Sequence, residues 1–256
     1  MKRLIAANWK MNLAPHEAGL LVRRLETKLA PHPQTEVVIC PPAIDIFPLA
    51  KDLDRTKLKL GAQNIHFADD GPYTGEISAP MLKGLADYVL VGHSERRAMG
   101  EDDKTIAKKL AAAVRNNLTP ILCVGETLTE RQHNLSHKVV VDQLTAAVHE
   151  LTAADVSSLV VAYEPVWSID HHDGHAPVHA TPDEIRFAFT AIRTTLEELF
   201  GEEGIGNLRQ LYGGSADPDH CRAYLEMPHV DGLLVGTASL NYESFAKIVK
   251  TAQSLA

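Results

Sequence analysis

This sequence has few or none of the features that indicate a disulfide-rich, metal-binding, nucleic-acid-binding or membrane protein. It has three cysteines without a CxxC spacing, which argues against a disulfide framework or a zinc ribbon and predicts small buried thiols in a reducing, cytoplasmic compartment. It has no basic tract and a net charge of −8, so no nucleic-acid partner is expected. No apolar run reaches the length of a membrane span, and the short run Leu4–Ala7 is too brief for a signal peptide, so no membrane association is expected.

What the sequence does contain is a regular alternation of short apolar runs and amphipathic segments. There is no Gly/Ser linker or break in composition, so we expect one domain over residues 1–256. Eight strand–helix units of this length predict an α/β fold, a closed (β/α)8 barrel. A doubly wound open sheet is the second interpretation, but it normally has GxGxxG after the first strand, where this chain has Asn8-Trp9-Lys10.

The expected strands are Leu4–Ala7, Glu36–Cys40, Leu58–Gln63, Tyr88–Gly92, Thr119–Val124, Leu159–Tyr163, Leu208–Tyr212 and Val230–Val235. The expected helices are Pro15–Leu29, Ile44–Leu53, Ala79–Leu85, Asp103–Asn116, Ser136–Glu150, Pro182–Phe200, Pro218–Leu225 and Tyr242–Ser254. Thr181 and Pro182 have the residue types favoured at a helix cap and first turn. In a barrel of this type, chemistry is expected just past the carboxyl ends of the strands.

Glu164 is the first candidate, because it follows the apolar run Val160–Tyr163 and precedes Pro165, which ends the strand. A carboxylate at that point is expected to be partly desolvated, which raises its pKa and suits a general base. The alternative is a strand-end carboxylate that caps the next turn or pairs with a surface lysine.

His93 and Lys10 are the next candidates. His93 follows the fourth expected strand, and Ser94 after it is a plausible N-cap for a short helical turn. The positive end of that turn would disfavour an imidazolium, so a neutral His93 could polarise a substrate carbonyl. Lys10 follows the first strand, where it could attract an anion and pair with Glu95.

Glycine-rich turns follow the last two strands, at Gly213-Gly214-Ser215 and Gly236-Thr237, and together they favour a phosphorylated ligand. Trp167 begins a long loop, Ser168–Ala180, which we interpret as a lid over the substrate. The His- and Asp-rich stretch 170–175 also suggests a metal site, but it shows no fixed ligand spacing, and we expect no metal.

Six motifs, taken together and in order, resemble those of the triosephosphate isomerase family. They are Asn8-Trp9-Lys10-Met11-Asn12, Gly61-Ala62-Gln63-Asn64, Val91-Gly92-His93-Ser94-Glu95-Arg96-Arg97, Cys123-Val124-Gly125-Glu126, Ala162-Tyr163-Glu164-Pro165-Val166-Trp167 and Leu211-Tyr212-Gly213-Gly214-Ser215.

The resemblance implies an isomerase of glycolysis and gluconeogenesis that interconverts D-glyceraldehyde 3-phosphate and dihydroxyacetone phosphate without a cofactor. Enzymes of this family use a Glu base and a neutral His electrophile whose pKa values are tuned by their surroundings. The implied roles are a base for Glu164, an electrophile for His93 and enediolate stabilisation for Lys10 and Asn8. Glu95 would support the active site, and backbone groups around Ser215 and Gly236 would bind the phosphate. Glu126 would hold one end of the lid through Trp167.

The resemblance also implies a homodimer. The loop after the third strand would reach the second subunit, with Thr74 near Asn8 of the partner subunit and Glu76 near the partner subunit's Arg97. The length of this loop in a compact barrel favours such a role.

Two departures from the family pattern lie at the expected phosphate end. Asp170 replaces the lid glycine in a lid longer by about five residues, and Thr237 replaces the second glycine of the eighth-strand turn. These changes leave two alternatives open. One is the same chemistry on a four-carbon ketose phosphate, and the other is a sugar-phosphate-binding barrel without catalysis.

Overall fold

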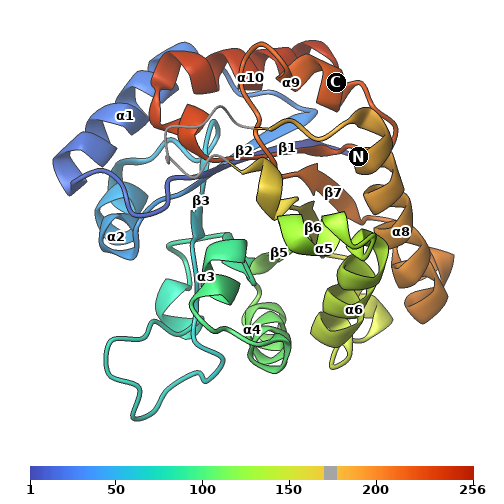
Figure 1. The fold of residues 1–256 in the computed structure, drawn as a ribbon. Helices are drawn as coiled ribbons and strands as arrows, with labels where there is room; N and C mark the ends of the chain where they lie inside the picture. Colours follow the sequence, from blue (N-terminus) through green and yellow to red (C-terminus); the bar gives the residue numbers. More distant parts are fainter. Residues whose placement is uncertain (170–177) are drawn as a thin grey trace.

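In the computed structural model, eight parallel strands close into one barrel surrounded by helices, as predicted (Figure 1). The structure describes residues 1–169 and 178–256. Each strand pairs with its neighbour in sequence, and β8 pairs with β1, with Leu4 opposite Gly232 and Ala7 opposite Val235. The open-sheet interpretation is therefore wrong. The strands are β1 Arg3–Asn8, β2 Thr35–Cys40, β3 Lys59–Ala62, β4 Tyr88–Val91, β5 Thr119–Val124, β6 Val160–Tyr163, β7 Arg209–Tyr212 and β8 Gly232–Val235.

Helices cover the outside of the barrel. The α-helices are α1 Pro15–Lys28, α2 Ala43–Asp52, α3 Ser94–Ala98, α4 Asp103–Arg115, α5 Leu128–Gln132, α6 Ser136–Val148, α7 Ala153–Val156, α8 Pro182–Gly204, α9 Cys221–Leu225 and α10 Tyr242–Ser254. The short 3-10 helices are η1 Pro80–Leu82, η2 Val166–Ser168 and η3 Thr237–Leu240. No helix in residues 1–169 or 178–256 is long and apolar enough to cross a membrane.

The core has two layers because the strand side chains alternate between the two faces of the sheet. The inner layer fills the barrel with small and medium side chains, among them Ala6, Val38, Leu90, Ala162 and Leu234. The outer layer lies between the strands and helices, where apolar stripes of the helices pack on the sheet. All three cysteines are free and buried, and Cys40 and Cys123 belong to the inner layer.

The helix predicted at Ala79–Leu85 is wrong, since only η1 forms there. The connection between β3 and β4 is instead an irregular projection over residues 63–79, which extends from the barrel at the lower left of Figure 1. Rings within it pack on each other, with the His66 and Tyr73 centroids 4.0 Å apart. The projection therefore has a local cluster of packed rings of its own.

Candidate active site

Neighbouring strands position the backbone of Glu164 directly after β6. Its amide donates to the carbonyl of Val124 at 2.8 Å, and its side chain is only 3% exposed. A β-carbon added at Gly125 would lie 1.9 Å from the Glu164 carbonyl oxygen, and one at Gly213 would lie 2.8 Å from its Cγ. Any larger residue at either position would displace Glu164, so both positions require glycine. The sequence identified Gly213 only as part of a phosphate turn, so this packing role was missed.

Glu164 and His93 are in direct contact across the mouth of the barrel. His93 Nε2 lies 3.1 Å from Glu164 Oε1, and the backbone amide of Ser94 donates to Oε2 at 3.3 Å. Burial opposes ionisation of Glu164, but its electrostatic interaction and hydrogen bond with His93 outweigh burial and hold the pKa of Glu164 below its ordinary value. The predicted rise in this pKa is therefore wrong, because the sequence could not reveal the imidazole beside the carboxylate.

The other ring nitrogen of His93 shows which tautomer the site favours. The Glu95 amide donates to His93 Nδ1 at 3.2 Å, so Nδ1 must carry a lone pair and the proton lies on Nε2. Burial disfavours the imidazolium, but the adjacent Glu164 carboxylate favours it and raises the pKa of His93. The predicted direction of this shift, from the positive end of the helical turn, is therefore wrong. His93 is itself the N-cap of α3, and the prediction that Ser94 is the cap is wrong.

Lys10 lies beside this pair in a backbone conformation uncommon for a non-glycine residue, with φ of 53°. Asn8 Oδ1 accepts from the Lys10 amide at 3.0 Å, and Gln63 Nε2 donates to the Lys10 carbonyl at 2.8 Å. Lys10 Nζ lies 2.8 Å from Glu95 Oε1, the pairing expected from the sequence. The positioning role of Gln63 was not foreseen, although it lies in one of the six motifs.

A cavity of about 320 Å³ joins these residues to the turns after β7 and β8. Its lining residues include Asn8, Lys10, His93, Glu164, Ser215, Gly236 and Thr237. The Ser215 amide donates to the Ser168 carbonyl at 3.0 Å, so this predicted phosphate donor is engaged in this structure. Ile169 also lines the cavity, whereas Asp170 and the histidine-rich stretch lie outside the described residues.

Trp167 at the start of the long loop is held from two sides. Its indole N–H donates to Glu126 Oε1 at 2.8 Å, and Tyr163 Oη lies 3.2 Å from both oxygens of that buried carboxylate. The guanidinium of Arg131 lies over the indole ring at 4.0 Å from its centroid and pairs with Glu184. The contact between Glu126 and Trp167 is as expected, while the stacking of Arg131 on the indole was not predicted.

The residues expected at a subunit contact are on the projection and beside α3. Thr74 and Glu76 are exposed. Arg97 donates to Asp103 at 2.5 Å and to the Gly92 carbonyl at 2.9 Å, so its guanidinium is held by its own chain.

A closed parallel barrel with a carboxylate, a histidine and a lysine around one cavity at its strand ends defines a (β/α)8-barrel enzyme site suited to proton transfer. The sequence model for "Triosephosphate isomerase" matches residues 3–252. The chain therefore belongs to the triosephosphate isomerase family.

Curated relatives agree over nearly the whole chain. The triosephosphate isomerase of Carboxydothermus hydrogenoformans is 42% identical over 251 residues, covering 97% of this chain and 98% of the relative. That of Aquifex aeolicus is 42% identical over 254 residues, covering 97% and 99%. That of Rhodopirellula baltica is 39% identical over 253 residues, covering 98% of both. The resemblance inferred from the motifs is thus confirmed.

Proposed function

We propose that this protein interconverts D-glyceraldehyde 3-phosphate and dihydroxyacetone phosphate, a step of glycolysis and gluconeogenesis. The observation that carries the proposal is the convergence of Glu164, His93 and Lys10 on one cavity, from the ends of β6, β4 and β1. The names of the relatives support the choice of a triose phosphate as substrate.

In the proposed mechanism, Glu164 removes a proton from the carbon beside the carbonyl and returns it to the neighbouring carbon. His93 donates through Nε2–H to the substrate oxygens, and the Lys10 ammonium stabilises the enediolate charge. A substrate seated between Glu164 and His93 separates them. That separation removes the main cause of the low pKa of Glu164 and makes the carboxylate a stronger base at the moment of reaction.

The phosphate would bind at the turns after β7 and β8. Ser215, Gly236 and Thr237 line that part of the cavity. The substrate phosphate would replace the Ser168 carbonyl as the acceptor of the Ser215 amide hydrogen bond. Thr237 can still offer its backbone amide, since only its side chain differs from the family glycine. The role of Asp170 in substrate binding stays a prediction.

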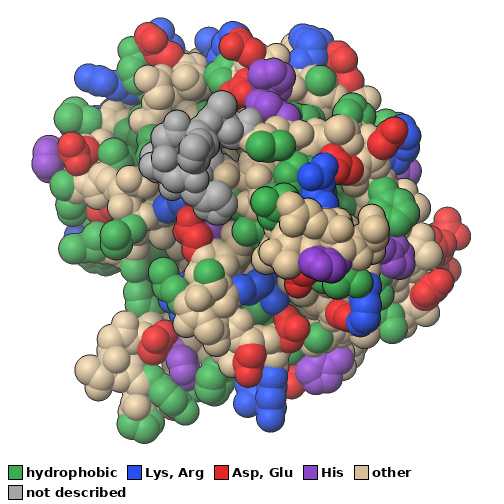
Figure 2. Space-filling view, in the orientation of Figure 1, with side chains coloured by type: hydrophobic (Ala, Val, Ile, Leu, Met, Phe, Trp, Pro, Cys, Tyr) green, Lys and Arg blue, Asp and Glu red, His purple; other side chains and the backbone are tan. Residues whose placement is uncertain are grey.

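We further propose a homodimer of single-domain subunits in the cytoplasm. Large apolar side chains are exposed on the segments that follow the adjacent strands β1, β2 and β3, including Met11 at 95%, Ile44 at 71% and Met81 at 62%. A cavity of about 270 Å³ joins α2 to the projection, and Figure 2 shows hydrophobic side chains on the projection itself. Exposed apolar surface of this kind supports an interface that includes Thr74, Glu76 and Arg97, and the buried thiols suit a reducing compartment.

The sharpest test shortens the proposed base. Glu164→Asp withdraws the carboxylate by roughly 1 Å, which should lower kcat by about 100-fold in a coupled assay of triose phosphate turnover. The exposed Glu203→Asp on α8 is the matched control and should keep the wild-type rate. A Glu164→Asp enzyme with wild-type kcat would show that Glu164 is not the base.

A further inference from the structure

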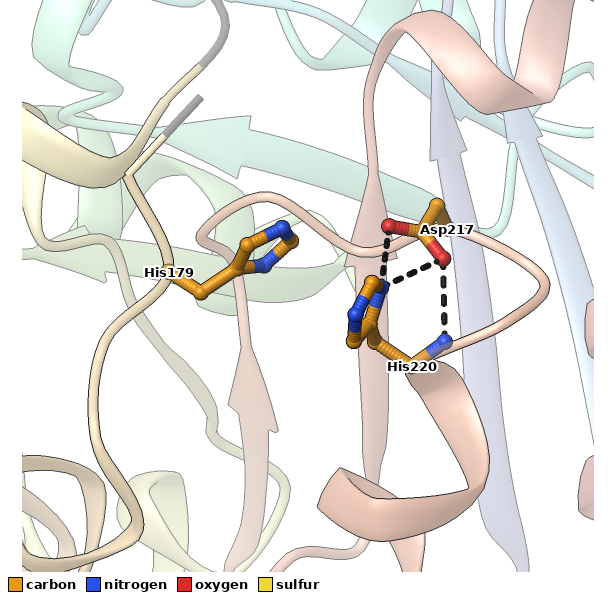
Figure 3. A group of neighbouring side chains, drawn as sticks. All are labelled: His179, Asp217 and His220. Atoms are coloured by element: carbon orange, nitrogen blue, oxygen red, sulfur yellow. Dashed lines mark hydrogen bonds and ion pairs between the residues drawn. The ribbon is translucent and has the colours of Figure 1, made fainter. Parts of the chain in front are cut away.

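A second group of chemically reactive side chains lies beside the candidate active site (Figure 3). His179 precedes α8, while Asp217 and His220 lie in the connection between β7 and α9, about 40 residues further along the chain. One possible ligand atom from each of the three lies within 4.8 Å of the others. The two imidazole rings face each other, with centroids 4.4 Å apart and planes inclined by 34°.

The carboxylate of Asp217 is held in place by several donors. His220 Nδ1 lies 2.7 Å from its Oδ2, and the backbone amides of Asp219 and His220 donate to Oδ1 at 2.8 and 2.9 Å. An ionised carboxylate only accepts hydrogen bonds, so the His220 proton lies on Nδ1 and the lone pair on Nε2. A cation held by both side chains would take the place of this proton, with His220 binding through Nδ1 and Asp217 through a carboxylate oxygen.

His179 has a comparable arrangement. Its Nδ1 lies 3.0 Å from the hydroxyl of Tyr224 on α9, which orients the ring and leaves Nε2 for a ligand. An imidazole such as His179, held through one ring nitrogen with the other free to bind, is typical of protein metal centres. None of these contacts is needed for the proton transfer proposed above.

We propose that His179, Asp217 and His220 bind a divalent transition-metal ion, with Zn²⁺ as the expected occupant. Two imidazoles and a carboxylate form a donor set that Zn²⁺ takes readily, with bonds of about 2.0–2.2 Å and a fourth position open to water. Ligand atoms within 4.8 Å of one another reach such a shell through side-chain rotation. The ion would fasten residue 179 to the loop after β7, which carries the turn at Gly213–Ser215.

The position of the site makes it more than an isolated surface feature. Asp217 also lines the cavity that contains Glu164 and His93. A bound cation would therefore lie at the edge of that cavity and cross-link the connections that follow β6 and β7. Binding of the ion does not depend on the proposed isomerase activity, and it is tested without a turnover assay.

The experiment titrates purified protein with ZnCl₂ alone in a non-chelating buffer at neutral pH, by calorimetry. We expect one site in the wild type, weakened about 10–100-fold or more in His179→Gln and in His220→Gln, because each change removes a ligand. The exposed His149, 3.7 Å from Glu150, provides the matched control His149→Gln, which should bind as the wild type does. Zn²⁺ should also raise the Tm of the wild type more than that of the double variant that combines His179→Gln with His220→Gln.

A further variant separates this site from the histidines outside the described residues. Replacing His171, His172 and His175 together by Gln should leave the Zn²⁺ affinity unchanged. Loss of the site in that triple variant would overturn the assignment to His179, Asp217 and His220. Equal affinity in the wild type and the double variant would overturn it as well, with the metal-free Tm showing that both proteins are folded.

Discussion

At the scale of single residues, the pairing of Glu164 with His93 determines the electrostatics of the site. The position of each could be predicted from its place after a strand, but their contact joins β6 to β4 and depends on barrel closure. Two buried ionisable groups 3.1 Å apart shift each other's pKa more than any local feature of the sequence. The base is therefore kept ionised by its neighbour rather than made basic by burial alone.

This reasoning predicts a rise in the pKa of Glu164 when His93 is replaced. His93→Ala removes both the attraction and the hydrogen bond while burial persists, so the pKa should rise clearly. His93→Gln keeps a hydrogen-bond donor and should give a smaller rise. The measurement is a ¹³C NMR titration of the side-chain carboxyl, assigned by its loss in Glu164→Gln, with the remote His137→Gln as control. An unchanged pKa in both His93 variants would contradict the coupling.

Other residue-scale features could not be predicted, for a related reason. Gly125 and Gly213 are needed because atoms of Glu164, directly after β6, lie too close to admit a side chain. A single sequence does not reveal such neighbours. The bond between the Ser215 amide and the Ser168 carbonyl likewise joins two loops 47 residues apart in the chain. Periodicity located the strand ends, whereas the contacts between them follow only from the register of the closed sheet.

At the scale of elements, the sequence signals were reliable where the interacting residues are only a few positions apart in the chain. The Thr181 hydroxyl accepts from the Glu184 amide, and the Glu184 carboxylate accepts from the Thr181 amide at 2.8 Å, as the predicted cap of α8 requires. The end of α8 was less predictable. Gly201 interrupts it with φ of 75°, and the helix resumes as far as Gly204.

Thr181→Ala should therefore destabilise the protein by about 1 kcal/mol, since it removes the side-chain acceptor at the start of the helix. Thr190→Ala on the same helix is the control. Its hydroxyl donates to the Arg186 carbonyl on the exposed face of the helix, and alanine favours a helix interior. Urea unfolding followed by circular dichroism compares the two. A Thr190 variant as unstable as the Thr181 variant would argue against a capping effect.

Short helices were the weakest part of the element prediction. Helices α5 and α7 have only five and four residues, too few for a recognisable period, and both begin at a threonine capping box. The segment Ala79–Leu85 has an apolar pattern but only one 3-10 turn forms, because the projection before it uses this stretch to return to β4.

At the scale of the whole molecule, eight strand–helix units were enough to predict a closed barrel with its site at the carboxyl ends of the strands. The opposite end contains a cluster that was not predicted. Glu36 accepts from the Tyr88 hydroxyl at 2.5 Å and from Arg209 at 2.9 Å, and it also pairs with Lys59. These residues come from β2, β4, β7 and β3, so the cluster exists only when the barrel is closed.

The cluster makes barrel stability depend on acid pH. Burial opposes ionisation of Glu36, but its bonds to Lys59, Tyr88 and Arg209 lower its pKa to about 2 from 4.5. A carboxyl with a depressed pKa in the folded state adds stability above its unfolded pKa and loses it as pH falls through the folded value. At about 1.4 kcal/mol per pKa unit, Glu36 contributes at most roughly 3 kcal/mol at neutral pH.

Glu36→Gln removes the charge while keeping the size of the side chain, so it should destabilise the protein by up to roughly 3 kcal/mol at pH 7. The difference from the wild type should shrink as pH falls from about 5 towards 2, because the wild-type carboxyl then takes up a proton too. Urea unfolding at fixed protein concentration across that range measures it, with the exposed Glu198→Gln on α8 as control. A difference that stayed constant down to pH 3 would mean that packing around residue 36, rather than its charge, connects the strands at this end of the barrel.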